Sequence, residues 1–139
     1  MNPSTKNQCR TSFKITGAFD PDVISDILHL TPERQWKIGD CRANGTQFDF
    51  ALWEVGVCTE YEAITDRQMR KTVAPLTEKI AELQKIRSEF DVSFTLEIVP
   101  TLYAGEQTPC LAPSLDIMDF CHATRTEIDM DLYLYGEKD

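Results

Sequence analysis

The chain has 139 residues and a formal net charge of −9. This acidity argues against nucleic acid as a direct partner, because contacts to phosphate need clustered Lys and Arg. No apolar run approaches the roughly 20 residues of a membrane-spanning helix, and the polar N-terminus lacks a signal-peptide core, so we expect a cytoplasmic protein with no membrane partner.

The size and composition are typical of a single globular domain over residues 1–139. Hydrophobic residues make up 42% of the chain and charged residues 27%, which is too apolar for a disordered protein. The first ten residues are polar, and we expect a loose N-terminal arm over 1–10. The five cysteines form no C-x-x-C pair, and without an export signal we expect reduced thiols.

The first predicted elements are a strand over 11–17 and a helix over 21–29. Apolar residues alternate with polar ones in the strand, which is the period of a half-buried strand. Asp20 is a strong helix N-cap, and Pro21 suits the first helical position because its missing N–H costs nothing there.

The next stretch predicts two strands joined by a turn-rich connection. A short strand is expected over 35–38, and a loop or long hairpin connection over 40–47, where turn residues cluster. The segment 48–58 is rich in aromatic and β-branched residues and predicts a longer strand. Both faces of that strand are partly apolar, which favours a central strand or an edge strand packed on both sides.

A second helical pattern occupies the middle of the chain. Apolar residues recur every three or four positions from Met69 to Phe90. Thr65 and Gln68 have the spacing of a capping box at the start of this helix. Pro75 lies inside the pattern and cannot donate a backbone hydrogen bond, so we expect a kink or break there.

The last third predicts a strand, a short helix and a closing strand. The strand runs over 92–101, and Pro100 suggests that it lies at a sheet edge or ends there. Ser114 can cap the helix. The closing strand over 127–135 alternates strongly, and we expect its apolar half to face the core: Ile128, Met130, Leu132 and Leu134.

This order of elements predicts an α+β fold. Alternating strands with polar outer positions favour a single, largely antiparallel sheet of four to five strands, with helices packed mainly on one face. The specific hypothesis is a ferredoxin-like variant with an added helix and strand.

With these elements placed, the chain resembles a small bacterial family of domains of unknown function. The resemblance covers about 13–135 and depends on Gly17-x-Phe19-Asp20-Pro21, Trp36-x-x-Gly39-Asp40, Trp53, and Ile128-Asp129-Met130-Asp131-Leu132-Tyr133. It implies an α+β fold and no established activity. Similar small acidic proteins act as immunity proteins beside bacterial toxins, which is an analogy only.

The negative charge is concentrated at one end of the chain. Residues 92–139 carry a net charge of −7, whereas 1–58 and 59–91 each carry −1. Carboxylates two apart on one strand face could be a solvated surface, bind a hard cation, or receive Lys and Arg from a partner. We expect a partner-binding surface, without metal or cofactor, formed by Asp129, Asp131, Tyr133, Tyr135, Glu97 and Glu127.

Two other groups of residues are candidate sites. Trp36, Asp40 and Trp53 could line a small-molecule pocket, although Trp packing is the commoner role. Cys110, Cys121 and His122 could suggest zinc, but adjacent residues on a helix point about 100° apart, so we expect Cys121 in the core and His122 on the surface.

No nucleotide-binding, zinc-protease or nucleophile-elbow motif is present, which favours a binding protein over an enzyme. The leading hypothesis is an acidic immunity-type protein that neutralises a basic bacterial toxin domain, such as a nuclease. The alternatives are a small-molecule-binding or enzymatic domain with a Trp-lined pocket, and a structural module that forms a homo-oligomer through an exposed strand edge.

Overall fold

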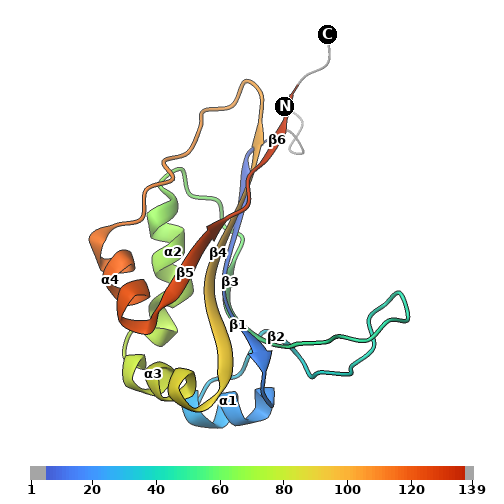
Figure 1. Cartoon of the computed structure of the whole chain (residues 1–139). Coiled ribbons are helices and arrows are strands. Elements are labelled where there is room, and N and C mark those ends of the chain that lie inside the picture. The colour runs from blue at the N-terminus through green and yellow to red at the C-terminus, as the bar shows by residue number, and fades with distance from the viewer. Residues whose placement is uncertain (1–5, 137–139) are drawn as a thin grey trace.

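The computed structural model of the chain describes residues 6–136. Its strands form one strongly curved sheet, and its helices lie against one face of that sheet (Figure 1). In chain order the elements are β1 (Gln8–Ala18), α1 (Pro21–Leu28), β2 (Arg34–Trp36), β3 (Ala51–Cys58), α2 (Thr65–Val73), the short 3₁₀ helix η2 (Ala74–Leu76), α3 (Ile80–Glu89), β4 (Asp91–Tyr103), α4 (Leu115–Thr124), β5 (Thr126–Met130) and β6 (Tyr133–Tyr135).

The sheet has the strand order β2-β3-β1-β4-β5, and β6 also pairs with β4. Neighbouring strands are antiparallel, except that β5 and β6 run parallel to β4. The predicted α+β class, with a mostly antiparallel sheet and helices on one face, is confirmed. The described residues contain six strands rather than four to five, because the closing stretch is divided into β5 and β6.

The predicted loose arm over 1–10 is wrong for its second half. Residues 8–10 already belong to β1, and Asn7 is buried, with its side chain accepting from the Tyr103 amide at 2.8 Å and donating to the Gln107 carbonyl at 2.9 Å. These bonds tie the start of the chain to β4 and the loop after it. Residues 1–5 lie outside the described residues.

The turn into α1 follows the sequence pattern closely. The Asp20 carboxylate accepts from the Asp22 amide at 3.0 Å, which confirms the N-cap, and Pro21 begins the helix. Gly17 has a positive φ of 142°, and a Cβ at this position would collide with the Asp91 carbonyl of β4. Only glycine lets β1 lie this close to β4.

The break at Pro75 is confirmed, but the capping box is wrong. The long helical pattern divides into α2, η2 and α3, with Pro75 inside η2. The N-cap of α2 is Ile64, which makes no side-chain cap bond. The Thr65 hydroxyl instead donates to the Cys110 carbonyl at 2.6 Å, because this backbone pairs with the loop before α4.

Pro100 does not end its strand or lie at the edge of the sheet. It is buried inside β4 and pairs with Cys9 of β1. The Ile98 carbonyl accepts from the Asp131 amide at 2.9 Å, and by strand alternation the nitrogen of Pro100 faces the same side. A proline has no N–H for the next ladder bond, so the pairing is interrupted between β5 and β6.

The closing strand was expected to bury its apolar half, and this expectation is largely wrong. Ile128 is half-buried against the core, but Met130, Leu132 and Leu134 are 37%, 45% and 70% exposed. The reason is position, since β5 and β6 lie at the margin of the sheet, where no further strand or helix of the described chain covers them. An alternating pattern reports a strand's two faces but not whether both are covered.

The core lies between the sheet and the helices. Its largest wholly buried side chains include Phe13, Trp53 and Phe94, from β1, β3 and β4. The Phe13 and Phe94 rings pack with centroids 5.7 Å apart, and Phe120 of α4 lies 6.3 Å from Phe13. Cys121 is also buried and His122 exposed, as expected for α4.

Candidate partner-binding surface

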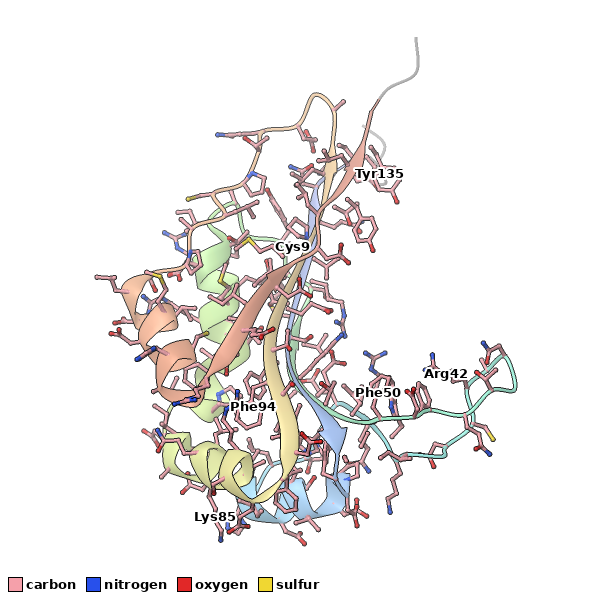
Figure 2. All side chains as sticks on the ribbon, viewed as in Figure 1. Cys9, Arg42, Phe50, Lys85, Phe94 and Tyr135 are labelled. Carbon is pink, nitrogen blue, oxygen red and sulfur yellow. The ribbon has the colours of Figure 1, made fainter. Side chains whose placement is uncertain are left out.

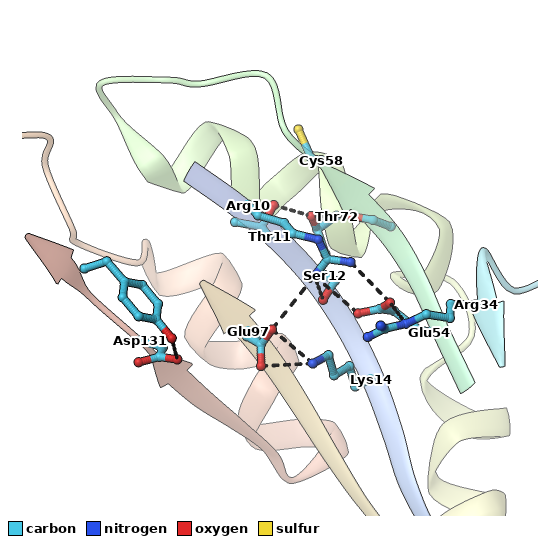
Figure 3. A network of polar contacts seen from close by, with 12 residues as sticks. Arg10, Thr11, Ser12, Lys14, Arg34, Glu54, Cys58, Thr72, Glu97 and Asp131 are labelled. Atoms are coloured by element: carbon cyan, nitrogen blue, oxygen red, sulfur yellow. Dashed lines mark hydrogen bonds and ion pairs between the residues drawn. The ribbon is translucent and has the colours of Figure 1, made fainter. Parts of the chain in front are cut away.

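The sheet face away from the helices, which we call the open face, is polar (Figure 3). Strand alternation directs one half of β1 into the core and the other half outward. Arg10, Ser12 and Lys14 are outward residues in the middle of β1, and Glu54 and Glu97 extend beside them from β3 and β4. These side chains form one connected network.

Glu54 is the centre of this network. Its side chain is wholly buried, although it lies on the open face. Oε1 accepts from Nη2 of Arg10 at 3.3 Å and from Nε of Arg34 at 3.0 Å, and Ser12 beneath it is also buried. The two guanidinium groups cover the carboxylate and exclude water, and together they link β1, β2 and β3.

Burial alone would raise the pKa of Glu54, because it penalises the charged form. Hydrogen bonds from Ser12 and Arg10, together with the charges of Arg10 and Arg34, outweigh that penalty and hold the pKa below its ordinary value. Glu54 is therefore ionised at neutral pH. A carboxylate that is hydrogen-bonded to two cations in this way is a poor general acid or base.

Glu97 is the second carboxylate in the network. Its Oε1 lies 3.0 Å from Nζ of Lys14 and 3.9 Å from Nη1 of Arg10. The three basic side chains of this region, Arg10, Lys14 and Arg34, therefore all face carboxylates. The centre of the open face is rich in charge but internally neutralised.

The predicted acidic row lies at one margin of this open face. The register pairs Asp129 of β5 with Glu97, and Glu127 with Thr95, so these residues are neighbours as expected. Glu127, Asp129 and Asp131 are exposed. Within residues 6–136, none of these three carboxylates forms an ion pair, in contrast to Glu54 and Glu97.

Two tyrosines continue the row along β6. The Tyr133 hydroxyl donates to the Asp131 carboxylate at 3.1 Å, and this bond and the charge of Asp131 raise the pKa of Tyr133. The Tyr135 ring stacks on Tyr103 with centroids 5.3 Å apart. Tyr133 and Tyr135 are 47% and 54% exposed, so each presents aromatic area to solvent.

The two tryptophans do not line a common pocket. Trp53 is wholly buried on the helix side of β3, where its indole N–H donates to the Ser25 hydroxyl at 2.9 Å. Trp36 pairs with Leu52, the neighbour of Trp53, and therefore lies on the opposite face of the sheet. Asp40 accepts from the Lys37 amide at 2.8 Å and serves a turn. The alternative in which these three residues line one pocket is therefore wrong, and Trp53 has the commoner packing role.

Residues 37–50 form a hairpin arm that projects away from the helices, beyond the open face (Figure 1). Trp36 stacks on Phe48 with centroids 3.8 Å apart, and Phe50 meets both rings edge-on. The guanidinium groups of Arg34 and Arg42 lie over Trp36 and Phe48. Figure 2 shows Phe50 near the base of the arm and Arg42 further out.

A groove of about 610 Å³ lies at the far end of β3. Glu33 in its wall accepts from the Gly56 and Val57 amides at 2.9 and 3.2 Å, so the backbone donors here are already satisfied. Lys71 is likewise paired, with Glu60 and Glu62. Glu33 and Lys71 are therefore both bound to other groups of the protein.

In the part of the chain that the structure describes, no three His, Cys, Asp or Glu side chains are grouped as a metal site would require. The five cysteines are free thiols. Burial raises the pKa of Cys121 to about 11, which makes it a poor nucleophile. Burial, and secondarily the nearby Cys58, likewise raise the pKa of Cys9 to about 11.

Sequence reasoning found the acidic row but missed the network around Glu54. A signal was present, because Glu54 is the sole charged residue in the apolar segment 51–58, and Arg10, Ser12 and Lys14 repeat with strand period. The arm's aromatic stack was also missed. It depends on which residues of a hairpin lie opposite one another, and local pattern does not give that register.

Fold and surface together define a small α+β domain with one helix-covered sheet face and one polar face. The chain belongs to the family described as "Domain of unknown function (DUF4279)", whose model matches residues 7–135. This confirms the resemblance to a family of unknown function. No curated protein and no solved structure matches the chain. Among residues 6–136, no helix is long and apolar enough to cross a membrane.

Proposed function

We propose that this protein is a protein-binding domain that binds a basic partner through its acidic edge, defined as Glu127, Asp129 and Asp131 with Tyr133 and Tyr135. The observation that carries the proposal is the contrast between two groups of carboxylates. Glu54 and Glu97 are neutralised by Arg and Lys, whereas the edge carboxylates are exposed and face no cation among residues 6–136. Exposed tyrosines beside them suit a protein interface, where aromatic area is enriched.

The most specific form of the proposal is an immunity-type protein of the bacterial cytoplasm that neutralises a basic toxin domain, such as a nuclease. A nuclease holds phosphate with Lys and Arg, so an acidic inhibitor can block that site and be steered toward it. The analogy with immunity proteins and the charge of −7 over 92–139 support this form. A toxin reading frame beside the gene would strengthen it.

The test is capture of a basic protein by the wild-type chain and by the double variant Asp129→Lys/Asp131→Lys. We expect the charge reversal to abolish capture, since it places two cations where the partner's cations bind. The matched control is Glu78→Lys/Glu89→Lys, which changes the net charge equally at two exposed positions of the helix layer. Equal loss in both double variants would show that only net charge matters and would contradict the proposed site.

We also infer that the first four strands are a ferredoxin-like variant. The elements β1, α1, β2, β3 and β4 follow the order β-α-β-β-α-β when the helical segment α2–η2–α3 is counted as the second helix. The strand order β2-β3-β1-β4 with antiparallel neighbours supports this assignment. The unit α4–β5–β6 is then an addition at the β4 side. The acidic edge belongs to this addition.

A further inference from the structure

The outer margin of β5 is an unpaired strand edge. In the described chain β5 is the last strand on its side of the sheet. The Asp131 amide donates to Ile98 of β4, so alternation directs Glu127 and Asp129 to β4 as well. The backbone groups of Ile128 and Met130 therefore point outward, and an exposed row of such groups is a template for another strand.

The two faces of this edge differ in chemistry. On the open face the side chains are the carboxylates Glu127, Asp129 and Asp131, all exposed. On the other face are apolar side chains, of which Met130 is 37% and Leu132 45% exposed. The sequence pattern is that of a strand covered on its apolar side, and the described chain covers Ile128 in part but leaves Met130 and Leu132 exposed. An added strand would bury it.

A second copy of this chain is a poor occupant of the edge. Antiparallel pairing of β5 with its own copy about Asp129 would place Asp129 opposite Asp129 and Glu127 opposite Asp131. Each cross-strand pair on the open face would then be two carboxylates, which is destabilising. The carboxylates therefore discriminate against self-association and in favour of a cationic strand.

We propose that β5 binds its partner by strand addition, and that the partner supplies an extended segment in which Lys or Arg alternates with apolar residues. The cationic side chains meet Glu127, Asp129 and Asp131, and the apolar ones cover Met130 and Leu132. The backbone of Ile128 and Met130 supplies the hydrogen bonds. This inference rests on the proposed function and adds the conformation and sequence pattern of the partner.

The probe is the acetylated and amidated peptide Lys-Val-Lys-Val-Lys-Val-Lys, added to the full chain. We compare it with two N-methylated forms, one methylated at the three Val and one at three of the Lys. In a strand, amides of alternate residues point to opposite edges, so one form blocks the edge that faces β5 and the other blocks the solvent edge. An antiparallel addition is blocked by methylated Val and a parallel one by methylated Lys.

We expect one methylated form to bind at least about tenfold more weakly than the other, because several hydrogen bonds are lost together. In the complex with the unmodified peptide, hydrogen exchange of the Ile128 and Met130 amides should slow by a similar factor. A peptide with the same residues in blocks, Lys-Lys-Lys-Lys-Val-Val-Val, should bind more weakly than the alternating one.

The outcomes separate this inference from the proposed function. If the two methylated forms bind equally and the Ile128 and Met130 amides stay unprotected, strand addition is wrong. In that case the proposed acidic binding site would still stand, provided that Asp129→Lys/Asp131→Lys abolishes binding of the peptide. If that double variant binds the alternating peptide as wild type does, the proposed function itself fails at this edge, and the inference fails with it.

Discussion

Among single residues, Glu54 has the most demanding environment, because its carboxylate is wholly buried on a face that is otherwise wet. Replacing it by Gln leaves Arg34 without its anion and removes the nearer of the two carboxylates that face Arg10. Breaking a buried pair costs about 3–5 kcal/mol, and the partial exposure of both arginines lowers our expectation to about 2 kcal/mol. Urea unfolding measures this, with Glu97→Gln as the matched control, for which we expect less than about 1 kcal/mol.

We expect the contribution of Glu54 to the free energy of unfolding to depend on pH. The pKa of Glu54 in the folded protein is lower than its ordinary value of 4.5, so the folded state favours the ionised form. Its stabilisation is complete above the pKa of the unfolded chain and is lost as the pH falls through the lower folded pKa. The difference in unfolding free energy between wild type and Glu54→Gln should be constant above about pH 5.5 and should shrink below about pH 4.5. A difference that persists unchanged in acid would contradict the ionised assignment.

Two glycines with positive φ provide a second comparison at this scale. Gly56 has φ 70°, and a Cβ there would collide with the Thr72 carbonyl of α2, whereas Gly45 has φ 87° and open space around it. We expect Gly56→Ala to destabilise the fold by at least about 2 kcal/mol and Gly45→Ala by about 1 kcal/mol. Thermal unfolding of the two variants measures both losses of stability. Equal losses would mean that backbone strain alone determines the effect, and a larger loss for Gly56→Ala would show the added effect of the close contact between β3 and α2.

At the scale of elements, the two tryptophans should behave differently although both lie beside β3. Trp53 is wholly buried in the core, so Trp53→Ala should cost about 3–5 kcal/mol. Trp36 is half-buried and stacks on Phe48 at the base of the arm, so Trp36→Ala should cost only about 1 kcal/mol. Denaturant unfolding distinguishes the two, and similar losses would mean that the arm is part of the core.

Some of these elements could be predicted from the sequence and others could not. Period and capping residues predicted β1, the break at Pro75 and the helix after Ser114, because those features depend on neighbours along the chain. The division between β5 and β6 was not predicted, since it depends on the place of Pro100 in β4, between Ile98, which pairs with Met130 of β5, and Thr101, which pairs with Tyr133 of β6. The exposure of Met130 and Leu132 was missed for a related reason. The alternation of apolar and polar residues predicts which face of a strand is apolar, but it does not predict whether that face is covered by the same chain or by a partner.

At the scale of the whole molecule, charge is sorted along the sheet. The cations of the open face are matched by Glu54 and Glu97 at its centre, and the unmatched carboxylates lie at the β5 margin. The acidic margin was predictable from the sequence, because the net charge of successive segments shows that the negative charge is concentrated in 92–139. The network around Glu54 was not, because it joins residues from three strands whose pairing depends on the tertiary fold.

The most direct test of the central claim is the association rate of the protein with a basic partner as salt is raised from about 20 to about 200 mM, a range over which the Debye length shortens from about 20 Å to less than about 10 Å. If the acidic edge steers the partner, the rate for wild type should fall at least about tenfold over this range. Asp129→Lys/Asp131→Lys should associate more slowly and lose most of that salt dependence, whereas Glu78→Lys/Glu89→Lys should retain it. A wild-type rate that does not change with salt would contradict the account.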